Sequence, residues 1–427
     1  MEYLLFAAYL IFFAWLVTRV TFFKRTGLSK SQLVILFLLK VMAGIFYGWI
    51  GIYYGGLAKM VDTWNYHTLS IAEYNLLFSD PGEYFTNLFY NPYEGGIRKF
   101  FGTTDSYWND LKGNLFIKVL SVFNVFTTGN YYINVIFYSF LTLFGPVAFF
   151  RIMDDVFPGR RTVVLLATFL VPSFLYWTSG IHKEGLIFTG LSLIIYVIYF
   201  GTKERTFNTG RILSLVIGFF LVLALRNFIV VLLLPALLAW LIAIRYPRYC
   251  RRIFVVAYLL YGTFFFTARY LHPALDFPQA VVTKQQEFFK LRGYSTIPMK
   301  ELEPTALSFL KNTPQAINFS AIRPYPGDVR HILSLAAAVE INVLLVMLAF
   351  LLFLRVKGAK NRAVLYFCVF FSISILLAIG FSINNLGAIV RYRSIIIPLL
   401  VVPMAAQINW ARIGTWLSEK TRFKSNN

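Results

Sequence analysis

Long apolar runs recur along this sequence and limit what the chain can fold into. Each run holds roughly 14–22 residues, and an α-helix needs about 20 to cross the hydrocarbon core of a bilayer. The clearest runs start at eleven positions: Leu4, Leu33, Tyr131, Thr162, Leu186, Ile212, Phe228, Ile253, Leu333, Ala363 and Ser394. Apolar residues make up 58% of the 427, whereas soluble domains average about 45–50%. The sequence therefore predicts an all-α, polytopic transmembrane helix bundle with about eleven spans.

The placement of the basic residues predicts the orientation of the chain. Six segments on one side of the predicted bundle hold 22 Lys/Arg and 4 Asp/Glu, and the segments on the other side hold 15 and 13. The six segments are 19–30, 151–161, 203–211, 245–252, 355–362 and the tail from 412. The positive-inside rule puts this set in the cytoplasm, with the amino terminus outside and the carboxyl terminus inside. The net charge of +21 is thus an orientation signal, and we expect no nucleic-acid partner.

The loops predict a single integral membrane domain over residues 1–427 with two long outer loops, 54–113 and 272–332. Glu2 precedes the first apolar run and basic residues follow it, the reverse of a cleavable signal peptide, so we expect this run to be a retained span. The short inner loops lack a GxxxxGK[ST] or GxGxxG motif, which argues against nucleotide chemistry in the cytoplasm. Within the outer loops, we expect helices over Thr63–Phe78, Ala280–Leu291 and Met299–Lys311, and an interfacial or re-entrant helix over Leu115–Phe126.

Asp62 lies just beyond the outer end of the second predicted span. On a helix, Asp62 and Tyr66 share a face, and His67 follows directly. A carboxylate at this position could act as a general base, because partial burial raises its pKa toward neutrality. Asp is also a favoured helix N-cap, which is the structural alternative.

The stretch SGIHKEG joins two predicted spans on the outer side. A short polar stretch between apolar runs is easily explained as a turn. A turn does not require His182, Lys183 and Glu184 in succession, however. Lys183 could bind a phosphate as a point charge, Glu184 could orient it, and His182 could titrate near neutral pH.

Arginines occur at the same predicted outer face, against the orientation rule. Arg226 separates two spans, and Arg391 and Arg393 begin the last one. Arginine suits phosphate through its rigid fork of donors, although an arginine at a membrane boundary can also be a snorkelling anchor. Arg323 and Arg330 in the second long loop could join them.

Glu340 lies about two turns inside a predicted span, which makes it a functional candidate. The structural alternative is a salt bridge to Arg269 or Arg226. The four histidines have no metal-ligand spacing, so no cofactor is implied. The sequence also allows a divalent cation to bind between Asp62 and a lipid phosphate.

Three stretches resemble the GT-C superfamily of membrane glycosyltransferases and the related polysaccharide polymerases of the bacterial envelope. They are VDTWNYH around Asp62, PSFLYWTSGIHKE ending at Glu184, and the segment from Asn385 to Pro398 that carries Arg391 and Arg393. The chain departs from many members because Asp62 has no acidic neighbour and no soluble carboxyl-terminal domain is evident. The resemblance implies an enzyme of the bacterial inner (plasma) membrane, with Asp62 as catalytic base and a polyprenyl-linked donor.

Together, the residues and the resemblance predict a membrane glycosyltransferase acting on the non-cytoplasmic face. It would move a sugar from a polyprenyl-(pyro)phosphate donor to an envelope glycan or lipid acceptor. A polymerase that joins two lipid-linked glycans is one alternative. A flippase without chemistry is another, although no internal repeat supports it. Transfer of acyl or phosphoglycerol groups completes the alternatives.

Overall fold

The computed structural model describes residues 2–53, 62–93, 106–291, 293, 295–356 and 358–415. Within these ranges the chain is all-α, and its only extended pairings are two isolated bridges, which agrees with the predicted fold class. The longer helices are α1 (Glu2–Val17), α3 (Lys30–Tyr53), α4 (Asp62–Ser79), α6 (Tyr107–Thr127), α7 (Tyr131–Val156), α8 (Arg161–Phe169), α9 (Pro172–Ser179), α10 (Lys183–Glu204), α11 (Thr209–Arg245), α12 (Cys250–Thr267), α13 (Phe277–Lys290), α14 (Ala306–Ile317), α15 (Ile332–Phe353), α16 (Arg362–Ser382), α17 (Leu386–Ser394) and α18 (Ile397–Gln407). The short helices are α2 (Thr21–Lys24) and α5 (Pro81–Thr86).

Among the described residues, seven helices are long and apolar enough to cross a membrane, and up to nine spans result if each bent helix pair counts as one. The bent pairs are α8 with α9, at 53°, and α17 with α18, at 65°. The predicted count of eleven is therefore not reached. Many of the apolar side chains on these helices face outward: only 17% of the apolar window of α15 is buried inside the protein. Outward apolar faces of this extent fit a lipid surrounding, so the chain is a multi-span membrane protein.

The difference in span count comes from α1 and α11. α1 has 16 residues, which is short for a crossing. The two spans predicted from Ile212 and Phe228 are the two halves of the 37-residue α11, which is counted once although it joins two helices across a kink at Arg226, where the backbone leaves helical geometry (φ −158°, ψ 75°). A straight helix of this length would measure about 55 Å, well beyond a hydrocarbon core of about 30 Å.

Contacts on both sides of Arg226 show that α11 reverses direction there. Gly218 packs on Gly190 and Arg226 reaches the first turn of α10, so the first half of α11 runs antiparallel to α10. In the second half, the Trp240 ring lies 5.0 Å from Phe367, near the start of α16. The segment before α16 and the end of α10 both bind the end of α7. Both ends of α11 therefore lie at one end of the bundle, and Arg226 lies at the other.

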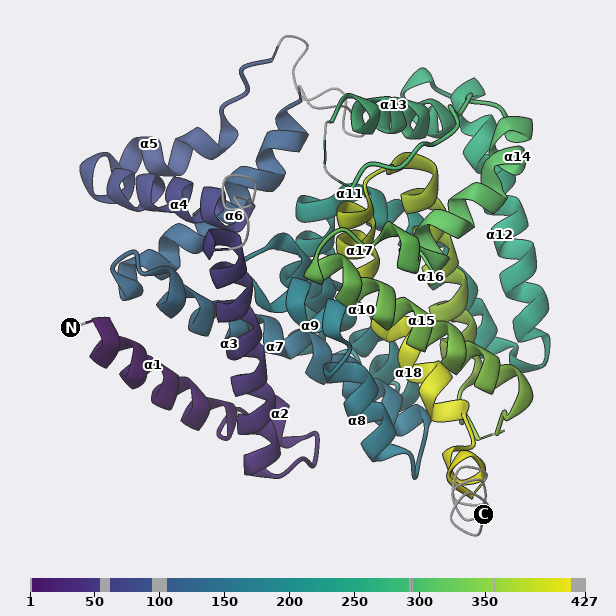
Figure 1. The fold of residues 1–427 in the computed structure, drawn as a ribbon, viewed down its shortest axis with the longest axis horizontal. Helices are drawn as coiled ribbons and strands as arrows, with labels where there is room; N and C mark the ends of the chain where they lie inside the picture. The colour runs from purple at the N-terminus through teal and green to yellow at the C-terminus, as the bar shows by residue number, and fades with distance from the viewer. Residues whose placement is uncertain are drawn as a thin grey trace.

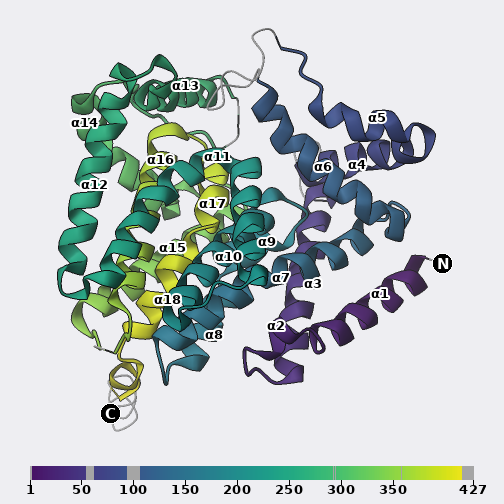
Figure 2. The same ribbon diagram turned by 180° about the vertical axis from the view of Figure 1, so that it is seen from behind.

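The two sets of loops separate in space as the charge pattern predicts. α2 and the carboxyl-terminal end lie at the bottom of Figure 1, whereas α13 and α14 lie at the top and α4 to α6 at the upper left. The reverse view shows the same division (Figure 2). Which end faces the cytoplasm stays a prediction from the charge pattern.

The long outer loops are largely helical where the structure describes them. α4 confirms the helix expected from Thr63 to Phe78. α6 has 21 residues, so the expectation of a 12-residue helix from Leu115 was wrong: Ser106 caps the helix by accepting a hydrogen bond from the Asn109 N–H, and this cap starts it earlier. α13 and α14 cover parts of the other two expected helices, and a short turn, Pro326–Asp328, precedes α15. Residues 54–61 and 94–105 of the first loop lie outside the described residues.

Candidate functional site

Five of the residues singled out from the sequence meet at the end of the bundle where α11 reverses. They are Asp62, His182, Glu184, Arg226 and Arg391, and we call them the Asp62 cluster. Asp62 begins α4, His182 directly precedes α10, and Glu184 lies in the first turn of α10. Arg226 is the reversal point of α11, and Arg391 lies in the short helix α17. The two ends of the cluster are separated by 329 residues in the chain.

The segment that carries His182 is held by a close contact between α3 and the end of α9. A Cβ placed on Gly180 would lie 2.2 Å from the Tyr47 ring, so only glycine allows this approach. Lys40 of α3 is buried, and its Nζ donates to the Thr178 carbonyl at 2.6 Å. This bond satisfies a carbonyl at the end of α9 that the helix itself leaves unpaired. The contacts fix the chain just before His182.

The breaks in two helices bring the arginines to the cluster. α17 has 9 residues and begins with an Asn385 cap, and the chain then bends by 65° into α18. The bend turns Arg391 toward Asp62. Since α11 reverses at Arg226, its guanidinium reaches Glu184 at the start of the neighbouring helix. The polar positions that interrupt the apolar runs are therefore the positions that form the site.

His182 lies between two carboxylates. Its Nδ1 contacts Glu184 Oε2 very closely, and its Nε2 lies 3.1 Å from Asp62 Oδ2. Arg391 Nη1 donates to the same Asp62 oxygen at 2.7 Å, and Arg226 Nη2 donates to Glu184 Oε1 at 2.8 Å. Arg391 Nε lies 3.6 Å from Glu184 Oε1, so Arg391 faces both carboxylates.

This geometry requires a shared proton. A neutral imidazole has one N–H and can donate to one carboxylate only. The other contact of His182 needs a proton of its own, held either on the ring or on a carboxylate. Burial lowers the pKa of His182, and the hydrogen bond with Asp62 acts against this. The cluster therefore has the composition of a proton relay that runs from Asp62 to Glu184.

The structure contradicts the expected raised pKa of Asp62. Burial alone would raise it, but the hydrogen bond with His182 and the charge of Arg391 outweigh burial and hold the pKa well below its ordinary value. Asp62 is thus a carboxylate at neutral pH. The N-cap alternative receives no support, because none of the described backbone N–H groups donates to this side chain.

Access to the cluster is from the Asp62 side. The side chain of Asp62 is 43% exposed, whereas those of His182 and Glu184 are 2% and 0% exposed. Both contacts of Asp62 use Oδ2, so Oδ1 has no hydrogen-bond partner among the described residues. Tyr66 lies beside the opening, with its ring 5.9 Å from the His182 ring, which agrees with the predicted common face of Asp62 and Tyr66.

The cations of the cluster are only partly neutralised. Within the described residues, Arg226 Nη1 and Arg391 Nε are buried without a hydrogen bond. Lys183 has no carboxylate partner in the same part of the chain, and its Nζ lies 5.0 Å from the centre of the Tyr66 ring. Buried donors without acceptors are costly, and a bound anion would satisfy them.

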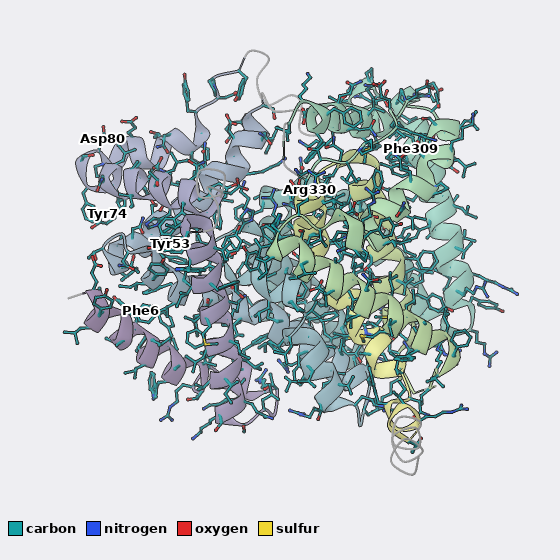
Figure 3. The ribbon with its side chains drawn as sticks, in the orientation of Figure 1. Phe6, Tyr53, Tyr74, Asp80, Phe309 and Arg330 are labelled. Carbon is teal, nitrogen blue, oxygen red and sulfur yellow. The ribbon has the colours of Figure 1, made fainter. Side chains whose placement is uncertain are left out.

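Four other residues named from the sequence have different surroundings. Arg393 is buried and donates through Nη1 to the carbonyls of Ser320 and Arg323, each at 2.9 Å. Arg323 lies 3.6 Å from Asp328. Arg330 lies just before α15, in the upper half of the view with Phe309 (Figure 3). The structure therefore does not bring these arginines into the Asp62 cluster.

His67 is the fourth of these residues. It is buried, and its ring lies 5.3 Å from the Tyr131 ring. Burial lowers the pKa of His67 to about 4. It is therefore neutral at pH 7 and packs as an uncharged side chain.

Glu340 forms neither of the salt bridges weighed from the sequence. It accepts hydrogen bonds from the Ser173 N–H and hydroxyl, both at 2.6 Å. Arg226 binds Glu184 instead, and Arg269 donates to the Pro304 carbonyl. The carboxylate holds the first turn of α9, where free N–H groups and the helix dipole favour a negative charge.

Four residues of the site environment were missed from the sequence: Lys40, Lys112, Trp177 and Tyr392. The Tyr392 ring lies 3.9 Å from the Arg226 guanidinium, and Trp177 lies 6.0 Å from that of Arg391. Lys40 had a readable signal, because it is a lone charge within an apolar run. No local pattern marks the others, since their role depends on which helices meet.

No group of three or more His, Cys, Asp or Glu side chains suited to a metal occurs among the described residues. Comparison with protein-family models, curated proteins and solved structures finds no match to this chain. The family resemblance noted from the short motifs therefore has no support from overall similarity, and function has to be argued from the site.

Proposed function

We propose that this protein is a membrane glycosyltransferase that uses a polyprenyl-(pyro)phosphate-linked sugar on the non-cytoplasmic face. The observation that carries the proposal is the Asp62 cluster itself. It combines an accessible carboxylate, a relay histidine and buried guanidinium donors without acceptors, all at one end of a helix bundle. A reaction at a membrane boundary needs a donor already activated and delivered by the lipid, and cations stabilise its phosphate as it leaves.

The proposed step is a substitution at the anomeric carbon of the donor sugar, with Asp62 as the base. Asp62 Oδ1 accepts the hydrogen bond of the acceptor hydroxyl and takes its proton as the oxygen attacks the anomeric carbon. The bond from that carbon to the donor phosphate oxygen breaks, and the lipid (pyro)phosphate leaves with one more negative charge. Arg391 and Arg226 face this charge. His182 and Glu184 hold Asp62 in place and share the proton.

Because the pKa of Asp62 is low, its carboxylate is deprotonated at neutral pH but is a weak base. Its role is to accept the proton late, when the attacking oxygen has become acidic through bond formation. The lowered value also means that Asp62 does not lose its charge in mildly acidic surroundings. Most of the rate enhancement would then come from the guanidinium groups at the leaving phosphate.

The test is sugar transfer by purified full-length protein, with radiolabelled polyprenyl-phosphate and polyprenyl-diphosphate sugars and a crude envelope acceptor. Native protein should transfer label, and Asp62→Asn should lose at least a hundredfold while folding equally well. Asp80→Asn is the matched control, because Asp80 caps α5 in the same loop region and Asn caps equally well. Full activity of Asp62→Asn would remove Asp62 from the chemistry.

The same assay separates the alternatives. If label appears in a growing lipid-linked glycan, the protein is a polymerase, which uses the same step with a different acceptor. If native protein transfers nothing while a labelled lipid-linked glycan crosses proteoliposomes, the flippase replaces the enzyme.

A further inference from the structure

Two lysines with no ion pair lie beside the Asp62 cluster, on the side of Tyr66. Lys183 is the first residue of α10, and its Nζ lies over the Tyr66 ring. Lys112 lies on α6, one turn before Phe116, whose ring is 5.1 Å from the Tyr66 ring. Residues four apart share a helix face, so Lys112 also points toward Tyr66. Neither lysine has a carboxylate partner among the residues that the structure describes.

The electrostatic surroundings of Lys112 place it in the same group of cations. Burial and the charges of Lys284 and Arg226 together lower the pKa of Lys112 to about 8, and the charge of Glu287 acts against them. Lys284 of α13 is itself paired with Glu287 at 2.7 Å, so it adds little net charge. Lys112 is thus held near other cations, and the nearby carboxylate of Glu287 is already paired with Lys284, so the excess of positive charge indicates a missing anion.

The net charge of the Asp62 cluster and the two lysines indicates the charge of that anion. Arg226, Arg391, Lys183 and Lys112 contribute four positive charges, and Asp62 and Glu184 remove two, leaving +2. The shared proton of the cluster makes this +3. A sugar linked to a polyprenol through one phosphate carries −1, whereas one linked through a diphosphate carries −2 and leaves as a −3 group.

We propose that the donor is a polyprenyl diphosphate sugar, with one phosphate at Arg226 and Arg391 and the other at Lys183 and Lys112. This inference rests on the proposed function and specifies its donor. Two phosphate subsites explain why four helices, α6, α10, α11 and α17, each contribute a cation in or beside the Asp62 cluster. They also place the bridging and terminal oxygens of the leaving group against separate cations, and this stabilises its third negative charge.

The test measures binding of three soluble probes to the full-length protein in detergent by calorimetry. The probes are geranyl diphosphate, geranyl monophosphate and inorganic diphosphate. Native protein should bind geranyl diphosphate at least tenfold more tightly than geranyl monophosphate. Lys112→Met should weaken the diphosphate about tenfold and the monophosphate less than threefold, and Lys112→Arg should restore most of the binding. Lys311→Met, an exposed lysine on α14, is the charge-matched control.

Each other outcome has a distinct meaning. Equal affinity for the two geranyl probes, with both lost in Arg391→Gln, overturns the diphosphate and leaves the lipid-phosphate donor standing; an acidic acceptor would then explain the lysines. Inorganic diphosphate binding as tightly as geranyl diphosphate overturns the lipid source. No binding of any probe overturns the proposed donor altogether. Unfolding temperatures of all variants check that the fold is kept.

Discussion

The buried pair of Glu184 and Arg226 gives the sharpest test of the site geometry. Glu184 is fully buried, and its oxygens contact Arg226 at 2.8 Å and the His182 ring. At an effective dielectric of about 20, two charges 2.8 Å apart attract by about 6 kcal/mol before desolvation is subtracted. Breaking such a pair from one side typically costs about 3–5 kcal/mol, because the remaining charge is buried without a partner.

Glu184→Gln should therefore lower the free energy of unfolding by about 3 kcal/mol or more. The double variant Glu184→Gln with Arg226→Gln should recover a large part of the loss, because no buried charge is left alone. Arg226→Gln alone should be destabilised to a similar extent as Glu184→Gln.

The assay is a double-mutant cycle on purified protein in detergent, with unfolding followed by tryptophan fluorescence. A coupling free energy of about 2–3 kcal/mol between the two positions would support the pairing. Additive effects of the two substitutions would refute it. They would show that Arg226 is not held by Glu184, and that the reversal of α11 has another cause.

Three further predictions concern pH and packing. The stability difference between native protein and Asp62→Asn should be constant from pH 8 to about 5 and should shrink below about pH 4. The reason is that a carboxyl group whose pKa is lowered by folding stabilises the fold only above its unfolded pKa. Denaturation at pH 7, 5 and 3 measures the difference, and a difference that already shrinks between pH 7 and 5 would contradict the prediction. The buried His67 has a pKa of about 4, and the unfolded chain takes up its proton, so this residue should cost native protein up to about 2 kcal/mol of stability between pH 6.5 and 5. His67→Phe should reduce the loss of stability between these pH values by that amount, as measured by denaturation at both; the buried His182 accounts for part of the slope that remains. Gly180→Ala should cost about 1–3 kcal/mol because its Cβ would overlap the Tyr47 ring. Gly327→Ala, with open space around it, should cost much less in the same thermal unfolding measurement.

The sequence predicted the class of fold and most of the cluster, and the reasons are physical. Apolar runs of membrane length can hardly form anything but helices, because lipid offers no partner for backbone polar groups. Charged residues at the ends of such runs cannot move far from the boundary. Asp62, His182 and Arg391 were therefore recognisable from their position alone, although they are far apart in the chain.

The span count and several partners could not be predicted. A polar pair between two apolar runs is compatible with a turn or with a kink, and α11 consists of two helices joined across a kink at Arg226, where the chain reverses. The pKa of Asp62 depends on Arg391, which arrives from the other end of the chain. Likewise, Glu340 finds Ser173 because α15 packs against α9, and sequence spacing does not encode helix packing.

The charged residues of the site are far apart in the sequence, and their positions determine the order in which they are synthesised. Glu184 and Arg226 are 42 residues apart on neighbouring helices, so they can neutralise each other as soon as this helical hairpin is made. Asp62 and Arg391 are 329 residues apart, and Arg391 arrives only with the last pair of helices. During biogenesis the buried carboxylate of Glu184 is thus neutralised early, whereas the Asp62 cluster is complete only when translation is nearly finished. Shortened chains that end before α17 should insert stably and be inactive.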